Sequence, residues 1–130
     1  MKFLHTMIRV SNIENSLKFY QGVLGLKLIR TKELKDKATL YFLGDEKSCC
    51  EIELTYNHTP PEKGYSHGTY FGHLAFETDS MDKFSERLKK HEYDYSRPPF
   101  NITEDGPKIA FIEDPDGYEI ELIERRKDYY

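Results

Sequence analysis

The tetrapeptide EIEL occupies residues 51–54 and recurs at residues 119–122, and this repeat decides how the chain is expected to fold. The two copies lie 68 positions apart, and the same offset relates His5 to His73. A repeat of a whole arrangement, unlike that of one short peptide, indicates internal duplication. The 130 residues are therefore predicted to form two copies of one structural unit.

Hydrophobic periodicity gives each copy the same order of elements, which is a strand, a helix and three more strands. In the first copy, strands are expected at residues 3–10, 26–31, 38–43 and 49–56, with a helix between Ser11 and Gly25. In the second copy, strands are expected at residues 72–77, 93–96, 108–113 and 118–124, with a helix after Ser80 and a loop over 97–107. The common offset matches residues 41–43 with residues 109–111. The predicted fold is α+β, with two tandem βαβββ units.

A stretch that contains a Pro-Pro pair and two glycines separates the two copies at residues 58–68. Such residues interrupt helices and central strands, so this stretch is interpreted as a linker. We therefore expect a single domain over residues 1–130, made of units at about 1–57 and 69–126.

Composition and charge exclude several classes of function. The chain is 38% hydrophobic and 32% charged, which is ordinary for a soluble globular protein. Its net charge is −4 and the basic residues are scattered among acidic ones, so nucleic acid is not an expected partner. The sequence has no apolar run long enough to span a bilayer, and His5 and Arg9 interrupt the N-terminal apolar residues too early for a signal peptide. We expect a cytoplasmic protein.

The spacing of the repeated histidines and glutamates is typical of a metal site. In a strand, Glu51 and Glu53 point to one face while the aliphatic residues of EIEL point to the other. If the sheets of the two units curve so that these faces meet, one histidine and one glutamate from each unit converge. Such a site suits a divalent ion such as nickel, zinc, cobalt, manganese or iron. The spacing does not choose between Glu51 and Glu53, or between Glu119 and Glu121.

Each of these residues also has a purely structural interpretation. A single histidine near the start of a strand is more often an ordinary packed residue, and alternating glutamates commonly form the solvated face of an antiparallel strand. The shared offset favours a metal site, because a solvated face has no reason to match histidine with histidine and glutamate with glutamate.

Several segments of the chain resemble one protein family. The segments LHTMIRV, SNIENSLKFYQGVLGLKLIR, EIELTYN, YFGHLAFE and AFIEDPDGYEIELIE are similar to the glyoxalase I family (lactoylglutathione lyases) of the short bacterial type, within the vicinal oxygen chelate superfamily. The resemblance runs from about Phe3 to Glu124 and implies a fold of paired βαβββ units. It also implies a homodimer in which each metal site lies at the subunit interface.

The resemblance implies a role for each matching residue. The implied metal ligands are His5, Glu53, His73 and Glu121, which bind one divalent ion per site, with Ni²⁺ favoured and Zn²⁺ or Co²⁺ possible. The implied reaction converts the hemithioacetal of methylglyoxal and glutathione into S-lactoylglutathione, with Glu121 as the principal base and Glu53 assisting. The family's thiol contacts fall on Arg9, Asn57 and, displaced by about one residue, Lys108.

Two alternative functions follow from the same superfamily. One is another metal-dependent enzyme, an epimerase or a thiol transferase, that uses a different thiol or substrate. The other is a metal-free protein that binds a small molecule. Related thiol transferases and dioxygenases lack a metal-binding carboxylate at the position of Glu53, and related epimerases have glutamine there, so Glu53 favours glyoxalase I.

Overall fold

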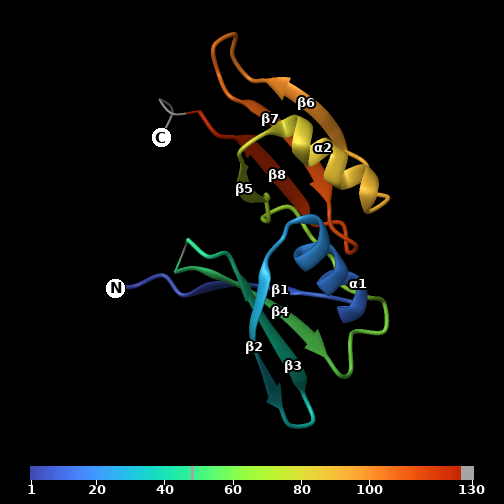
Figure 1. Cartoon of the computed structure of the whole chain (residues 1–130). Helices are drawn as coiled ribbons and strands as arrows, with labels where there is room; N and C mark the ends of the chain where they lie inside the picture. The colour runs from blue at the N-terminus through green and yellow to red at the C-terminus, as the bar shows by residue number, and fades with distance from the viewer. Residues whose placement is uncertain (48, 127–130) are drawn as a thin grey trace. The chain divides into compact units, whose positions relative to one another are not determined.

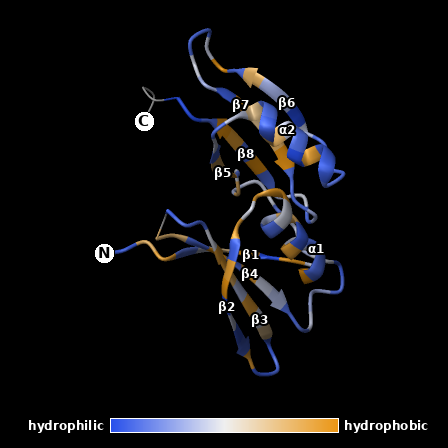
Figure 2. Ribbon diagram, in the orientation of Figure 1, coloured by the Kyte–Doolittle hydropathy of each residue, from blue (hydrophilic) through white to orange (hydrophobic). Residues whose placement is uncertain are grey.

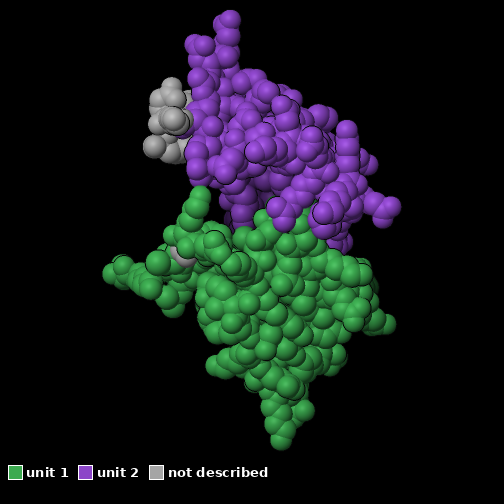
Figure 3. All heavy atoms as spheres, in the orientation of Figure 1, with its two compact units in different colours: residues 1–66 green, residues 67–130 purple. Residues whose placement is uncertain are grey.

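The computed structural model describes residues 1–47 and 49–126. The chain forms two compact units, residues 1–66 and residues 67–130, which Figure 3 shows in two colours. Each unit contains one four-stranded sheet and its own helical segment. The predicted α+β fold with two tandem βαβββ units is confirmed.

The first unit contains a mixed sheet of four strands, shown in the blue-to-green part of Figure 1. Its elements in chain order are β1 (His5–Arg9), α1 (Ile13–Leu17), the π-helical segment η1 (Lys18–Val23), β2 (Lys27–Leu34), β3 (Ala38–Gly44) and β4 (Glu51–Asn57). The sheet order is β1-β4-β3-β2, so the strand that opens the unit pairs with the strand that closes it. β1 runs parallel to β4, while the other neighbours are antiparallel.

The helical segment of the first unit begins at a polar cap and ends at a glycine. The side chain of Asn12 accepts a hydrogen bond from the backbone N–H of Asn15 at 3.0 Å, which satisfies one of the unpaired donors of the first turn. The expected helix is present in two parts, because α1 continues as the π-helical segment η1. Gly25 follows with a φ angle of +73°, a conformation that glycine adopts without steric cost.

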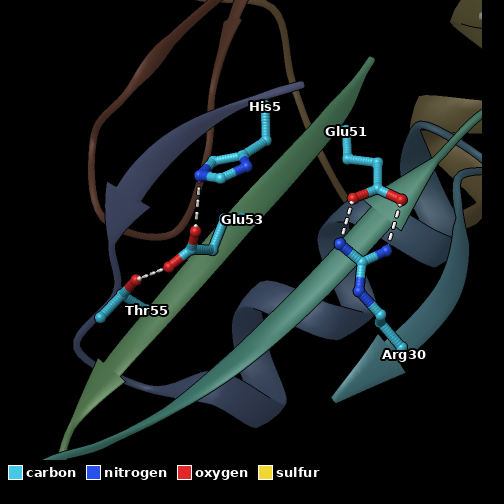
Figure 4. A network of polar contacts seen from close by, with 5 residues as sticks. All are labelled: His5, Arg30, Glu51, Glu53 and Thr55. Atoms are coloured by element: carbon cyan, nitrogen blue, oxygen red, sulfur yellow. Dashed lines mark hydrogen bonds and ion pairs between the residues drawn. The ribbon is translucent and has the colours of Figure 1, made fainter. Parts of the chain in front are cut away.

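The apolar core of the first unit lies between its helical segment and one face of its sheet. Phe19, Tyr20, Leu43 and Leu54 are all fully buried. Because strand residues alternate between faces, the side chains of EIEL that do not enter this core stand on the other face. Figure 4 shows these polar side chains in front of the sheet, with the helical ribbon behind it. In Figure 2 the turn between β2 and β3 is hydrophilic, as expected for an exposed hairpin tip.

The second unit has the same topology. Its elements are β5 (Leu74–Thr78), α2 (Met81–Lys90), β6 (Arg97–Asn101), β7 (Lys108–Glu113) and β8 (Glu119–Glu124), and the sheet order is β5-β8-β7-β6. The side chain of Ser80 caps α2, whose residues Met81, Phe84 and Leu88 are buried. None of the helices in residues 1–47 and 49–126 is long and apolar enough to cross a membrane.

The prediction for residues 93–101 is wrong in its details. The strand expected at residues 93–96 is absent, and β6 occupies Arg97–Asn101, where a loop was expected. Pro98 and Pro99 argue against a central strand, because proline cannot donate a hydrogen bond to the ladder. β6, however, is the edge strand of its sheet, and its pairing with β7 shifts register between Arg97 and Phe100. An irregular edge strand accommodates both prolines.

The constant offset of 68 residues does not hold for the third strand of each unit. Phe42 of β3 lies opposite Glu53, whereas Phe111 of β7 lies opposite Glu121. The structural equivalent of Phe42 is therefore Phe111 and not Ala110, because the connection between β3 and β4 is one residue longer than that between β7 and β8. Strand register, and not position in the chain, defines the equivalence.

Candidate metal site

The first unit brings His5 and Glu53 together. On the paired strands β1 and β4, His5 lies opposite Glu51 and Met7 lies opposite Glu53. The Nε2 atom of His5 is 2.9 Å from Oε2 of Glu53 (Figure 4). The side chain of Glu53 is only 10% exposed, whereas that of His5 is 37% exposed. The carboxylate is therefore largely enclosed, while the imidazole remains accessible within its unit.

The second unit repeats this pair with the same atoms. His73 immediately precedes β5, and its Nε2 atom is 3.0 Å from Oε2 of Glu121 in β8. The exposed fractions are again unequal, 41% for the imidazole and 13% for the carboxylate. The 68-residue offset between the two pairs thus corresponds to a repeated geometry and not only to repeated letters.

The other glutamate of each EIEL has a different partner. Arg30 donates two hydrogen bonds to Glu51, from Nη1 to Oε1 at 2.6 Å and from Nη2 to Oε2 at 2.8 Å (Figure 4). In the second unit, Nη2 of Arg97 donates to Oε1 of Glu119 at 3.2 Å. The hydrogen bonds from Arg30 lower the pKa of Glu51 below its ordinary value. In both units the first glutamate of EIEL faces an arginine and the second faces a histidine, a distinction that alternation alone did not provide.

The donor pairs fit a divalent cation. Metal–ligand distances to imidazole nitrogen and carboxylate oxygen are about 2.1 Å, so neighbouring ligands of an octahedral ion lie about 3 Å apart. The His–Glu separations of 2.9 and 3.0 Å agree with this distance and also with a direct hydrogen bond. Within the described part of the chain, no three His, Cys, Asp or Glu side chains gather at one point. Each unit therefore holds one imidazole nitrogen beside one carboxylate oxygen.

The three predicted thiol contacts lie at the ends of strands. Arg9 is the exposed last residue of β1 and, by alternation, shares a face with His5. Asn57 is the last residue of β4, and its side-chain amide donates to the hydroxyl of Tyr65 at 2.7 Å. Lys108 is the exposed first residue of β7. The first unit thus holds Arg9 and Asn57, and the second holds Lys108.

A hydroxyl group beside Glu53 was missed by the sequence analysis. Thr55 Oγ1 donates a hydrogen bond to Glu53 Oε1 at 2.9 Å, so the two carboxylate oxygens have different neighbours (Figure 4). Both residues are buried. Strand alternation gives a signal for this contact, since Thr55 follows Glu53 by two positions on the same face. The residue 68 positions later is Ile123, which has no hydroxyl to donate.

Two tandem βαβββ units, each with one His–Glu pair, define the class of protein. The chain belongs to the Glyoxalase/Bleomycin resistance protein/Dioxygenase superfamily, whose family model matches residues 2–122. This match extends from before β1 to Leu122, two residues before the end of β8, and so includes strands of both units.

Particular members of this superfamily are similar along almost the full chain. A lactoylglutathione lyase from Haemophilus influenzae is 44% identical over 129 residues, which cover 97% of this chain and 94% of that protein. A solved glyoxalase I from Zea mays is similar with a TM-score of 0.85 at 36% identity. The matched region includes 97% of this chain but only 45% of the maize chain. A trypanothione-dependent glyoxalase I from Leishmania major has a TM-score of 0.75 at 38% identity, covering 95% of this chain and 86% of that one.

Proposed function

We propose that the protein is a metal-dependent glyoxalase I that isomerises the hemithioacetal of methylglyoxal and glutathione to S-lactoylglutathione. The observation that carries this proposal is the pair of matched His–Glu contacts, at 2.9 Å in one unit and 3.0 Å in the other. The similarity to lactoylglutathione lyase from Haemophilus influenzae supports the reaction class. The physiological role is methylglyoxal detoxification.

The proposed metal ligands are His5, Glu53, His73 and Glu121. Imidazole nitrogen and carboxylate oxygen are donors that divalent first-row ions accept, and we favour Ni²⁺, with Zn²⁺ or Co²⁺ as alternatives. When bound, such an ion supplies Lewis acidity that stabilises the negative charge developing on the substrate oxygens. The protein's own contribution is to hold two carboxylates at the site, one of which moves the proton.

Glu121 is the proposed principal base. It takes the proton from the carbon that bears the sulfur and returns it to the adjacent carbonyl carbon, so the reaction needs no external proton. Glu53 assists from the other half of the site. The hydrogen bond from Thr55 to Glu53 supports this division, because Ile123 offers no donor at the corresponding position beside Glu121. A carboxylate held by fewer hydrogen bonds is better able to exchange a proton.

Arg9, Asn57 and Lys108 are the proposed contacts to the thiol. A guanidinium group binds a carboxylate through two parallel hydrogen bonds, which suits Arg9 to a carboxylate of glutathione. The amide group of Asn57 donates to Tyr65, which leaves its carbonyl oxygen to accept a hydrogen bond from the peptide. Because the similar protein from Leishmania major is trypanothione-dependent, another thiol is the main alternative to glutathione.

We further propose that the active protein is a homodimer. Each unit carries half of the proposed ligand set, and a two-fold axis generates two equivalent complete sites from two chains. The two units, at about residues 1–57 and 69–126, then act as one glyoxalase-type domain in each chain. The expected compartment is the cytoplasm, where glutathione keeps thiols such as the exposed Cys49 and Cys50 reduced.

Thioester formation from methylglyoxal and glutathione tests the proposal. Metal-stripped protein should be inactive, and addition of Ni²⁺ or Zn²⁺ should restore turnover. Glu121→Gln should lower kcat by at least about 100-fold, because the amide cannot act as a base. Glu113→Gln is a matched control, since Glu113 is an exposed glutamate at the end of the neighbouring strand β7.

Each other outcome points to a different function. Near-normal activity of Glu121→Gln would show that another group is the base. Tight metal binding without turnover would favour an epimerase or thiol transferase that uses a different thiol or substrate. A folded protein that binds no stoichiometric metal would favour a metal-free small-molecule-binding protein.

A further inference from the structure

In the first unit, the imidazole of His5 packs against a phenylalanine ring that also carries an arginine. The rings of His5 and Phe42 form a T-shaped contact, with centroids 5.7 Å apart and planes at 79°. The guanidinium carbon of Arg30 lies 4.0 Å from the centroid of the Phe42 ring. Phe42 is buried, with only 6% of its surface exposed. The imidazole and the guanidinium group therefore rest on one enclosed ring.

The second unit contains the same arrangement. The centroids of His73 and Phe111 are 5.8 Å apart and the ring planes meet at 78°. The guanidinium carbon of Arg97 is 3.7 Å from the centroid of the Phe111 ring, which is 5% exposed. The two units thus place an arginine, a phenylalanine and a histidine in matching geometry, although their loops differ in length.

Each arginine links this ring to the first glutamate of EIEL. In the register of the first sheet, Arg30 lies opposite Phe42, which in turn lies opposite Glu53. Arg30 reaches from the edge strand β2 across β3 to bind Glu51 on β4 with both of its terminal nitrogens. The contacts of Arg30, together with the His5–Phe42 contact, connect all four strands. The site face of the sheet is held by side chains as well as by the backbone ladder.

This arrangement solves two problems of a metal site. An imidazole ligand needs a fixed orientation, and partners of the ligands are usually what provides it. The site also contains a surplus carboxylate, because Glu51 lies opposite His5 and is two residues from Glu53. A divalent cation attracts any nearby carboxylate, so a carboxylate that must not bind needs another cation as its partner.

We propose that Arg30 and Arg97 are positioning residues of the metal site. Each packs on the phenylalanine ring that supports a ligand histidine, and each keeps the first glutamate of its EIEL away from the metal ion. The inference rests on the metal ligands of the proposed function, and it explains why only one glutamate of each EIEL is available to the metal and the substrate.

Three variants separate this role from a general effect on the fold. Arg30→Met keeps a long side chain over Phe42 but releases Glu51. The double variant Arg30→Met/Glu51→Gln also removes the charge of the released carboxylate. Lys27→Met is the matched control, because Lys27 lies on the same strand and forms an exposed ion pair with Glu46.

The visible spectrum of the Co²⁺-loaded protein reports on the coordination independently of turnover. In Arg30→Met we expect an altered spectrum, as the released carboxylate binds the ion, and a kcat lower by about 10-fold, which is typical for loss of a ligand's partner. KM should stay unchanged because the thiol contacts are untouched. The double variant should recover both the spectrum and kcat, and Lys27→Met should match the wild type. Arg97→Met should behave like Arg30→Met.

A wild-type spectrum in Arg30→Met, or a double variant that does not recover, would overturn the inference. Arg30→Lys serves as a second variant if Arg30→Met fails to fold, since lysine keeps the charge but not the bidentate contact. A spectral change in a protein that forms no lactoyl thioester would leave the inference intact and refute the proposed function. Normal turnover with no spectral effect of Arg30→Met would refute the inference alone.

Discussion

The substitution Thr55→Val removes the hydrogen bond by which the two units differ. Thr55 Oγ1 donates to Oε1 of Glu53 at 2.9 Å, and the two residues are only 6% and 8% exposed. Valine has nearly the same shape as threonine, so the substitution leaves the packing in place and removes only the donor. The carboxylate of Glu53 then loses its buried partner.

The expected loss of stability is about 1–2 kcal/mol in the metal-free protein. A hydrogen bond to a charged group contributes about 1.5–3 kcal/mol. The added methyl group of valine returns up to about 0.8 kcal/mol, because it is buried in place of a hydroxyl. Thr39→Val is the matched control, since Thr39 on the neighbouring strand forms an exposed hydrogen bond of the same length, 2.9 Å, with His58. Its effect should stay within about 0.5 kcal/mol.

Urea denaturation followed by circular dichroism measures both variants in the presence of a chelator. The midpoint of Thr55→Val should fall while the slope of the transition stays unchanged, since the surface exposed on unfolding is the same. Equal free energies of unfolding for Thr55→Val and Thr39→Val would refute the reasoning, because Glu53 would then not depend on its buried donor.

Two further predictions concern stability. Ser16 is fully buried in α1, and its hydroxyl oxygen has no hydrogen-bond partner among the residues the structure describes. The substitution Ser16→Ala should therefore raise the free energy of unfolding by about 1 kcal/mol. A decrease would show that the hydroxyl group is satisfied. The hydrogen bonds from Arg30 lower the pKa of Glu51 in the folded protein. This ion pair therefore stabilises the folded state fully above the unfolded-state pKa of about 4.3. Its stabilising contribution disappears as the pH falls through the lowered folded-state pKa. The stability difference between wild type and Arg30→Met should therefore be constant above about pH 5 and become smaller as the pH falls below the unfolded-state value in denaturation experiments, and a difference that does not change with pH would contradict this origin.

The elements that the sequence predicted well are those with strong alternation or caps. The strands that carry EIEL have strong alternation and the helix that starts after Ser80 has a cap, and the structure contains all three elements. β6 was missed because Pro98 and Pro99 oppose strand formation locally. Its place at the edge of the sheet, which makes the prolines tolerable, is a tertiary property that no local pattern contains.

The absence of tertiary information from local patterns also explains which parts of the site could not be predicted. His5 and both glutamates of the first EIEL recur at an exact common offset, so comparison of the two halves found them, whereas the choice of Glu53 over Glu51 came from the resemblance to glyoxalase I. Phe42 and Phe111 are 69 positions apart and Arg30 and Arg97 are 67 apart, so the common offset misses both pairs. Their equivalence comes from strand register across loops of different length, which only the paired sheets reveal.

The remaining differences between the units bear on how a duplicated site catalyses an asymmetric reaction. Equivalent pairs suit the proposed metal binding, since each unit holds the same two donor groups at nearly the same distance. Proton transfer, in contrast, needs carboxylates with different freedom to exchange a proton. The two units differ in the residues around the His–Glu pairs and not in the pairs themselves. Thr55 stands where the second unit has Ile123. Arg30 binds Glu51 by two short hydrogen bonds, whereas Arg97 binds Glu119 by one longer hydrogen bond. Both differences restrain the first unit more strongly, which agrees with the proposal that Glu121 is the carboxylate that moves the proton.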